Sequence, residues 1–452
     1  MSSIIPTDVH SLPPELLAQI FDYLATSFMF REGEMHSKCQ KQYFCMIGTP
    51  LDSARSPYQW LSVTEVCHYW RDVALSTSSL WSNFTLSNMA MTNTMLERSS
   101  ARVGRDIAIQ ARLERECQEQ LKTFNYIVSQ VSRVSSLDLV IDKESLEEIA
   151  PSLSNMDPHC LKKLSLVHDR HGSILCGIPD FHFPSLTEFS ASEIEFRALK
   201  PYLLPTLRSL SVYFVSDRCR YQLPELLSVL ESMPLLEDLT LVGALQATPS
   251  IAVAQLDVIN ERSVVFSHLK SLHISDYGVT VASFLAHVTL VKPAKLFLRL
   301  TAFYNSNELR LALDSFRTFI PRIVEYCWKD TLKSILLRSN EEEGELELKA
   351  WIRNPLYGVT APPLQSDADL IVLVESGRRL LMSAIEGLCS ALNPSLNHIH
   401  SAHLLGKSTD MLQMLDSLNS LNYLRLSSNN LQSSDLVLAS SKLRPDGMLV
   451  TV

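Results

Sequence analysis

Three short segments bring together side chains that could bind a metal ion or transfer protons. They are HSKCQKQYFC at residues 36–45, HDRH at residues 168–171 and HIHSAH at residues 398–403. A structural zinc site needs four ligands in tetrahedral geometry, and a catalytic site needs three ligands and an open position. The set His36, Cys39 and Cys45 lacks a fourth ligand. The imidazoles of His398, His400 and His403 have no further metal ligand near them in the sequence. We therefore expect no metal site at these segments.

Acid–base chemistry is an equally weak interpretation of the same residues. His168 and His171 have no nucleophile placed near them in the sequence, and Glu341–Glu343 is typical of a solvated charge run. The chain also contains no GxSxG, HExxH or P-loop pattern. The sequence therefore predicts no catalytic residues and no cofactor. An enzyme whose site forms only in the folded chain remains an alternative.

Composition limits the class of protein that could position these residues. The chain has 452 residues, of which 46% are hydrophobic, enough for two domains or one elongated repeat domain. Its formal net charge is −9, which argues against a nucleic-acid partner because phosphate neutralisation needs a basic surface. Nothing in the composition indicates a homo-oligomer.

The chain also lacks the patterns of secreted and membrane proteins. Its first residues have neither a basic segment nor an apolar one, so we expect no secretory signal. No run approaches the ~18 apolar residues that span a bilayer, so we expect no membrane association. The nine cysteines are scattered without framework spacing, as in proteins with reduced thiols. These features favour the cytoplasm, the nucleus or both.

The segment SLPPELLAQIFDYL, at residues 11–24, predicts a helix. Pro14 is suited to the first helical position, and Glu15 lies in the first turn, where the helix dipole favours an anion. The spacing of the apolar residues gives one broad apolar face that ends near Ala25. This face comprises Leu16, Leu17, Ile20, Phe21 and Leu24.

A second helical segment follows a long interruption. Residues 26–59 are polar, contain glycine and proline, and show no stable period, so we interpret them as an inserted loop. The following stretch, WLSVTEVCHYWRDVALSTSSLW, covers residues 60–81. Its apolar residues fall on one helical stripe, with Cys67 beside it: Val63, Val66, Trp70, Val73 and Ala74.

Taken together, the two segments resemble the F-box domain in the form common among fungal F-box proteins. The resemblance is carried by LPPELLAQIF at residues 12–21, VCHYWRDVA at 66–74 and LW at 80–81, in the order of the family pattern. The chain departs from the family in the step of 42 positions from Leu24 to Val66, where a short connection is usual. A surface loop of this length is thermodynamically tolerable.

The resemblance implies a role for the apolar face. F-box domains are small three-helix units that bind the adaptor subunit of SCF-type cullin–RING ubiquitin ligases. A unit this small cannot bury all its apolar residues on itself. The residues expected to contact the adaptor are Leu12, Pro13, Glu15, Leu16, Ile20, Val66, Cys67 and Trp70. Val66 and Trp70 have an equally good interpretation as internal packing residues.

The rest of the chain contains a weak repeat of the form LxxLxL, with steps close to those of leucine-rich repeats. The clearest copy is LNYLRLSSNNL at residues 421–431. Most copies lack the asparagine of the family pattern, so we expect an irregular array. The other copies are Val134-Leu137-Leu139, Leu161-Leu164-Leu166, Leu186-Phe189-Ala191, Leu207-Leu210-Val212, Leu236-Leu239-Leu241, Leu269-Leu272-Ile274 and Leu332-Ile335-Leu337.

These patterns predict an α/β chain in which a trihelical F-box precedes an irregular leucine-rich-repeat solenoid, with parallel strands on one face and helices on the other. The expected division is a tail at residues 1–9, the F-box at 10–84 and the repeats at 85–452. Residues 340–365 are acidic and contain prolines, so we expect a surface excursion there.

The expected function is therefore that of a substrate-recognition subunit of an SCF-type ligase, which holds a target protein on its repeats. A non-ligase interaction scaffold built on leucine-rich repeats is the alternative. The outward positions of the strands are the candidates for target contact, because side chains alternate along a strand. They are Lys163, Ser165, Ser209, Ser211, Tyr213, His273, Tyr423 and Arg425.

Overall fold

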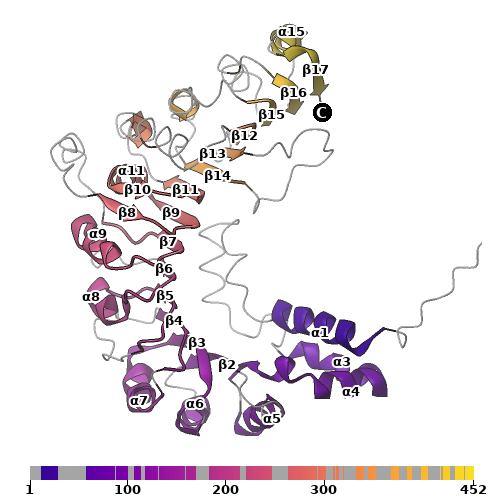
Figure 1. Ribbon diagram of the computed structural model, residues 1–452, viewed down its shortest axis with the longest axis vertical. Coiled ribbons are helices and arrows are strands. Elements are labelled where there is room, and N and C mark those ends of the chain that lie inside the picture. Colours follow the sequence, from indigo (N-terminus) through magenta and orange to yellow (C-terminus); the bar gives the residue numbers. More distant parts are fainter. Residues whose placement is uncertain are drawn as a thin grey trace, which may run out of the picture. The chain divides into compact units, whose positions relative to one another are not determined.

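The structure is a computed structural model of the whole chain, and its elements are shown in Figure 1. It forms two compact units, residues 1–202 and 203–452. The residues that it describes are 12–28, 58–86, 88–99, 106–113, 118–130, 132–157, 159–168, 183–213, 220–246, 263–292, 294–301, 309–310, 312–314, 319, 332–340, 345–352, 368–375, 384–388, 399–405, 418, 421–427, 433–441 and 443–451.

The first unit begins with a group of helices. Helix α1 runs from Pro14 to Phe28, so the predicted start is confirmed and the predicted end near Ala25 is three residues short. Residues 26–28 are therefore helical, and residues 29–57 of the expected inserted loop lie outside the described residues. Between residues 58 and 82, which the structure describes, lie the short helices η3 (Gln59–Ser62), α3 (Val63–Val66), α4 (His68–Ser76) and η4 (Ser78–Trp81).

Strands and helices alternate in the remainder of the first unit. The strands β1 to β5 pair in sequence order, and every pair is parallel. Helix α6 packs against β2, and α6 contacts α7. The elements are β1 (Asn83–Thr85), α5 (Met89–Ser99), β2 (Ile107–Leu113), α6 (Gln118–Gln130), β3 (Val134–Ile141), α7 (Lys143–Ser154), β4 (Lys163–His168), β5 (Glu188–Ser192), α8 (Phe196–Leu199) and η5 (Lys200–Tyr202).

The second unit has the same alternation at its start. Strands β6, β7, β9, β11 and β14 form parallel neighbours, whereas β8 pairs with β10 in a separate small sheet. The elements are β6 (Ser209–Tyr213), α9 (Leu223–Glu231), β7 (Asp238–Val242), β8 (Val264–Phe266), β9 (Ser271–Tyr277), α11 (Gly278–Ala286), β10 (Val288–Leu290) and β11 (Lys295–Thr301).

The end of the second unit departs from a wholly parallel arrangement. Strand β13 lies between β14 and β12 and is antiparallel to both, and the order then continues β15, β16, β17 in parallel. The elements are β12 (Ser334–Asn340), β13 (Glu345–Trp351), β14 (Leu370–Glu375), β15 (Ser401–Leu405), β16 (Leu421–Ser427), α15 (Ser433–Ser441) and β17 (Leu443–Thr451).

Strand β13 corrects the expected surface excursion at residues 340–365. Its residues ELELKAW alternate between polar and apolar side chains, which is the period of a strand. Leu346, Leu348 and Ala350 are buried. The acidic residues favour an exposed loop by composition although they occupy the alternating positions of the strand, and residues 353–365 lie outside the described residues.

The LxxLxL repeat predicts the strands well. Each of its copies coincides with a strand: β3, β4, β5, β6, β7, β9, β12 and β16. The second and third repeat positions are buried in every one of them, as for Leu137 and Leu139 in β3 or Leu424 and Leu426 in β16. Side chains alternate along a strand, so these two positions share one face. The opposite face is partly exposed in β3 and β6, whereas β9 and β12 also bury residues on that face, such as His273 and Leu336.

Candidate functional site

Helix α1 has two apolar faces rather than one. Its backbone begins on the Pro13 carbonyl, which accepts hydrogen bonds from the N–H groups of Leu16 and Leu17 at 3.1 Å each. Leu17 and Phe21 are buried. By contrast, Leu16 is 46% exposed and Ile20 is 48% exposed, although both belong to the same predicted face.

The buried face of α1 packs against α4. The rings of Phe21 and Trp70 lie 5.2 Å apart at 58°, a tilted contact favourable for aromatic pairs. The Tyr69 hydroxyl donates a hydrogen bond to the Leu12 carbonyl at 2.7 Å, which holds the start of α1 against α4. Further along α1, the Asp22 carboxylate accepts a hydrogen bond from the Ser79 hydroxyl of η4 at 3.0 Å.

Cys67 interrupts the helical stripe predicted for residues 60–81. Its backbone is extended, with φ −161° and ψ 171°, so α3 ends at Val66 and α4 begins at His68. The Cys67 sulfur accepts the Trp70 N–H at 3.4 Å and thereby caps α4. The break turns the Val66 side chain out of the packed stripe, and that side chain is 58% exposed.

A pair of tryptophans joins the N-terminal helices to α5 of the same unit. Trp60 and Trp81 are buried, and their rings meet edge to face at 5.2 Å. The Trp81 indole N–H donates to the Ala74 carbonyl at 2.9 Å, and the Arg98 guanidinium of α5 lies 4.2 Å from the Trp81 ring centroid. Arg133 in turn donates to the Ser99 carbonyl at the end of α5, at 3.2 Å. The helices therefore have a core of their own and do not need the exposed side of α1 for it.

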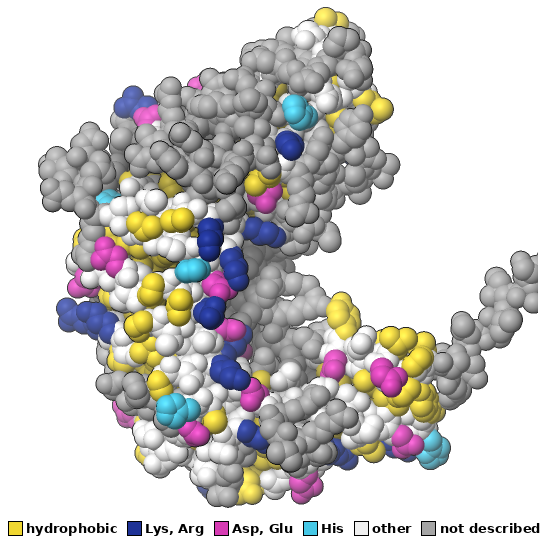
Figure 2. All heavy atoms as spheres, viewed as in Figure 1, with side chains coloured by type: hydrophobic (Ala, Val, Ile, Leu, Met, Phe, Trp, Pro, Cys, Tyr) yellow, Lys and Arg dark blue, Asp and Glu magenta, His cyan; other side chains and the backbone are white. Residues whose placement is uncertain are grey.

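The exposed apolar residues of this region define what we call the docking face: Leu16, Ile20, Tyr23 and Val66. The first three recur at i, i+4 and i+7 along α1, so they form one stripe on the helix. Tyr23 is 74% exposed. Figure 2 shows hydrophobic side chains at the surface of this helical region. Tyr23 is absent from the sequence-based set, although its spacing from Leu16 and Ile20 could have indicated it.

The predicted adaptor-contact residues are therefore brought together on one group of helices, with different exposure. Pro13, Glu15, Leu16, Ile20 and Val66 are exposed, whereas Leu12, Cys67 and Trp70 are half-buried. Trp70 contacts Phe21 through its ring, which fits its alternative interpretation as an internal packing residue. Val66 does not fit that interpretation.

The predicted target-contact residues all lie in strands, on the face opposite to the buried leucines, but in two different units. Lys163 and Ser165 belong to β4 in the first unit, and the other six belong to the second unit. The expected exposure is wrong for three of them, because Ser165, His273 and Tyr423 are buried. Lys163, Ser209, Ser211, Tyr213 and Arg425 are partly exposed.

The histidine segments have strand-like surroundings where they are described. His168 is buried at the end of β4, with its Nδ1 3.2 Å from the Ile141 carbonyl oxygen. His403 is buried in β15. Burial, with a smaller contribution from the Arg425 cation, lowers the pKa of His403 to about 4. The imidazole is therefore neutral near neutral pH.

The described residues contain no group of three or more His, Cys, Asp or Glu side chains that could hold a metal ion. Several of the candidates, namely His36, Cys39, Cys45, His171, Glu341–Glu343 and His398, lie outside the described residues. Across the described parts of the chain, no helix is long and apolar enough to span a bilayer. No protein-family model matches the chain, and no curated protein matches it significantly.

Proposed function

We propose that this chain is a substrate-recognition subunit of an SCF-type cullin–RING ubiquitin ligase. In this proposal the N-terminal helices form an F-box that binds the ligase adaptor, and the strands and helices that follow form an irregular leucine-rich-repeat solenoid that holds a target protein. The activity would take place in the cytoplasm, the nucleus or both.

The docking face is the observation that carries the proposal. An isolated apolar side chain at a protein surface is ordinary, but a stripe of three exposed apolar residues on one helix is a candidate protein contact. Leu17, Phe21, Trp60 and Trp81 fill the core of the helical group without it. The docking face is thus available to a second subunit.

The repeats support the second half of the proposal. Parallel neighbours in sequence order, each with buried apolar residues at the same two positions, are what stacked leucine-rich repeats would produce. The antiparallel strand β13 is a departure from that pattern. It supports an irregular array rather than a uniform one.

Such a subunit needs no catalytic residue of its own. By holding a target close to the charged ubiquitin-conjugating enzyme, the ligase raises the effective concentration of the target lysines. The contribution of this chain is then geometric: it binds the adaptor at one site and the target at another.

The proposal is tested by co-purification of the ligase adaptor and cullin with variants of the chain. Leu16→Glu with Ile20→Glu places two charges in the docking face, and we expect the adaptor to be lost from the purified complex. A matched control is Leu235→Glu with Val291→Glu, because these residues are 41% and 50% exposed in turns of the second unit.

Retention of the adaptor by the double variant of α1 would contradict the assignment of the docking face. Loss of the adaptor from the control as well would indicate a general effect of added charge. Recovery of adaptor without cullin would favour the interaction scaffold over the ligase subunit.

A further inference from the structure

Helix α1 begins at two prolines, so the residue before its first turn cannot cap the helix with its side chain. Pro13 precedes the helix, and Pro14 is its first residue. A proline side chain offers no oxygen to the N–H groups of a first turn, as Ser, Thr, Asp or Asn would. The N–H groups of Leu16 and Leu17 donate to the Pro13 carbonyl at 3.1 Å. Further contacts to the start of α1 therefore matter for the order of its first turn.

A tyrosine of another helix provides such a contact. The Tyr69 hydroxyl donates to the carbonyl of Leu12, two residues before α1, at 2.7 Å. Tyr69 lies in the first turn of α4 and is half-buried. That turn is itself capped, because the Cys67 sulfur accepts the Trp70 N–H at 3.4 Å. The donor thus comes from a capped turn of a helix that contains no residue of the docking face.

Trp70, the residue after Tyr69, fixes α1 at a second place. Its ring lies 5.2 Å from the ring of Phe21, which is buried in the second turn of α1. Leu16 and Ile20, two residues of the docking face, lie in the chain between these two fixed points. The bond from Tyr69 is the one on the N-terminal side of Leu16. Two neighbouring residues of α4 therefore hold both ends of the segment that presents the docking face.

We propose that Tyr69 is a positioning residue for adaptor binding, which acts through the Leu12 carbonyl on the first turn of α1. The inference rests on the proposed function in naming the adaptor as the partner. Helix ends open more readily than helix centres, and Leu16 lies in the first turn. When that turn is already ordered, binding does not have to supply the free energy of ordering it. Tyr69 needs no contact with the adaptor for this role.

The test is the affinity of the full chain for the purified ligase adaptor, measured by calorimetric titration. Tyr69→Phe removes the hydroxyl and keeps the ring. We expect about fivefold weaker binding, which corresponds to the loss of one net hydrogen bond. The amides of Leu16 and Leu17 should exchange faster in this variant, while those of α6 stay the same.

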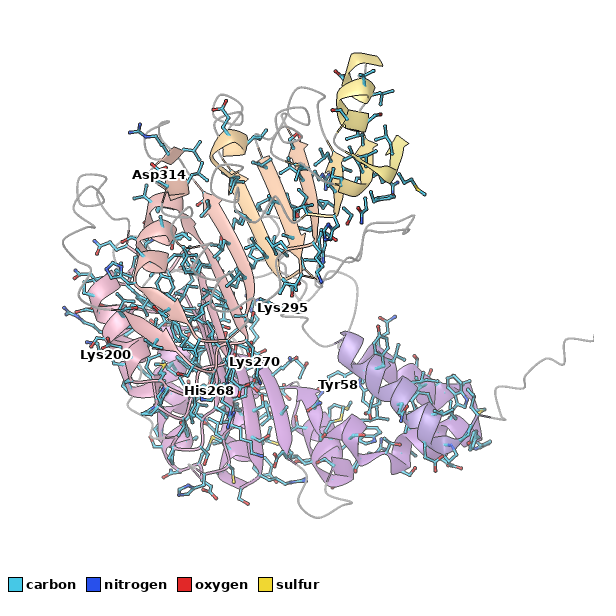
Figure 3. All side chains as sticks on the ribbon, turned by 45° about the horizontal axis from the view of Figure 1, so that its top comes forward. Tyr58, Lys200, His268, Lys270, Lys295 and Asp314 are labelled. Carbon is cyan, nitrogen blue, oxygen red and sulfur yellow. The ribbon has the colours of Figure 1, made fainter. Side chains whose placement is uncertain are left out.

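A matched control is Tyr58→Phe, which removes a similar hydrogen bond from the same group of helices. Tyr58 is half-buried just before η3, and its hydroxyl donates to the Thr85 carbonyl of β1. Figure 3 labels Tyr58 between the strands of the first unit and its N-terminal helices. Because this bond does not hold the start of α1, we expect adaptor binding by Tyr58→Phe to equal that of the wild type.

A double-mutant cycle separates positioning from a general loss of stability. In a chain that already carries Leu16→Ala, Tyr69→Phe should weaken binding little further, because the first turn no longer presents the leucine. With Tyr23→Ala the effects should add, since Tyr23 lies beyond the contact between Phe21 and Trp70. A general loss of stability would add to both variants alike.

Wild-type affinity in Tyr69→Phe would overturn the proposal, as would an equal loss in Tyr58→Phe or additive effects in both cycles. Leu16→Glu with Ile20→Glu keeps this proposal distinct from the proposed function. If that variant loses the adaptor while Tyr69→Phe binds it normally, the docking face stands and the positioning role is wrong. If both variants bind the adaptor normally, the docking face and the positioning role are contradicted together.

Discussion

Alanine substitution of two adjacent leucines of α1 should change different properties: Leu17→Ala mainly the stability of the chain, and Leu16→Ala mainly its affinity for the adaptor. Leu17 is fully buried, so Leu17→Ala removes packing, leaves a cavity and lowers the free energy of unfolding by about 2–5 kcal/mol. Leu16 is 46% exposed, so Leu16→Ala should change the stability by only about 0.5 kcal/mol or less. The neighbouring residues thus distinguish a core role from a contact role.

The effect on adaptor binding should follow the opposite order. Covering the exposed half of a leucine side chain contributes roughly 1 kcal/mol, half of the value for a fully buried one. Leu16→Ala should therefore weaken adaptor binding about fivefold. Leu17→Ala should weaken adaptor binding only to the extent that it increases the fraction of molecules in which the N-terminal helices are open.

Amide hydrogen exchange of α1 in the full chain measures local stability, and calorimetric titration with the adaptor measures affinity. We expect faster exchange in Leu17→Ala and unchanged exchange in Leu16→Ala. If Leu16→Ala opened α1 as much as Leu17→Ala did, the distinction between the two faces of the helix would be wrong.

Two further predictions concern buried polar groups of the second unit. The pKa of His403 in the folded chain is about 4, below its ordinary 6.5. Because the folded chain favours the neutral imidazole, the contribution of His403 to the free energy of unfolding is complete above pH 6.5 and is lost as the pH falls through 4. His403→Leu should remove up to about 3 kcal/mol of this acid sensitivity, measured by denaturant unfolding at each pH. Asp276 accepts hydrogen bonds from Arg220 and from the Leu245 N–H at 3.2 and 2.9 Å. Asp276→Ala should lower stability by about 2–4 kcal/mol and speed exchange of the Leu245 amide, whereas Asp276→Asn keeps an acceptor for that amide.

The strands were predictable because their signal is local. In β7, for example, Leu239 and Leu241 are buried as the repeat predicts, since alternation along one strand is enough to assign its faces. Strand β13 pairs antiparallel with β12, from which four residues separate it in the chain, and with β14, which begins at Leu370. Its acidic composition favours an exposed loop, and only tertiary pairing overrides that preference.

The docking face was predictable only in part. The sequence places Leu16, Leu17, Ile20 and Phe21 on one broad face, because periodicity shows which residues share a side of a helix but not how much of that side a neighbour covers. Trp70 of α4 packs against Phe21, and Leu17 is buried too, whereas Leu16 and Ile20 stay exposed. The break at Cys67 was missed because no proline or glycine marks it.

The most direct test of the docking face is hydroxyl-radical footprinting of the chain with and without the purified ligase adaptor. If Leu16, Ile20 and Tyr23 form the contact, their oxidation should fall when the adaptor is added, while that of the exposed Val437 in α15 stays the same. Unchanged oxidation of all three α1 residues in a formed complex would show that the adaptor binds elsewhere.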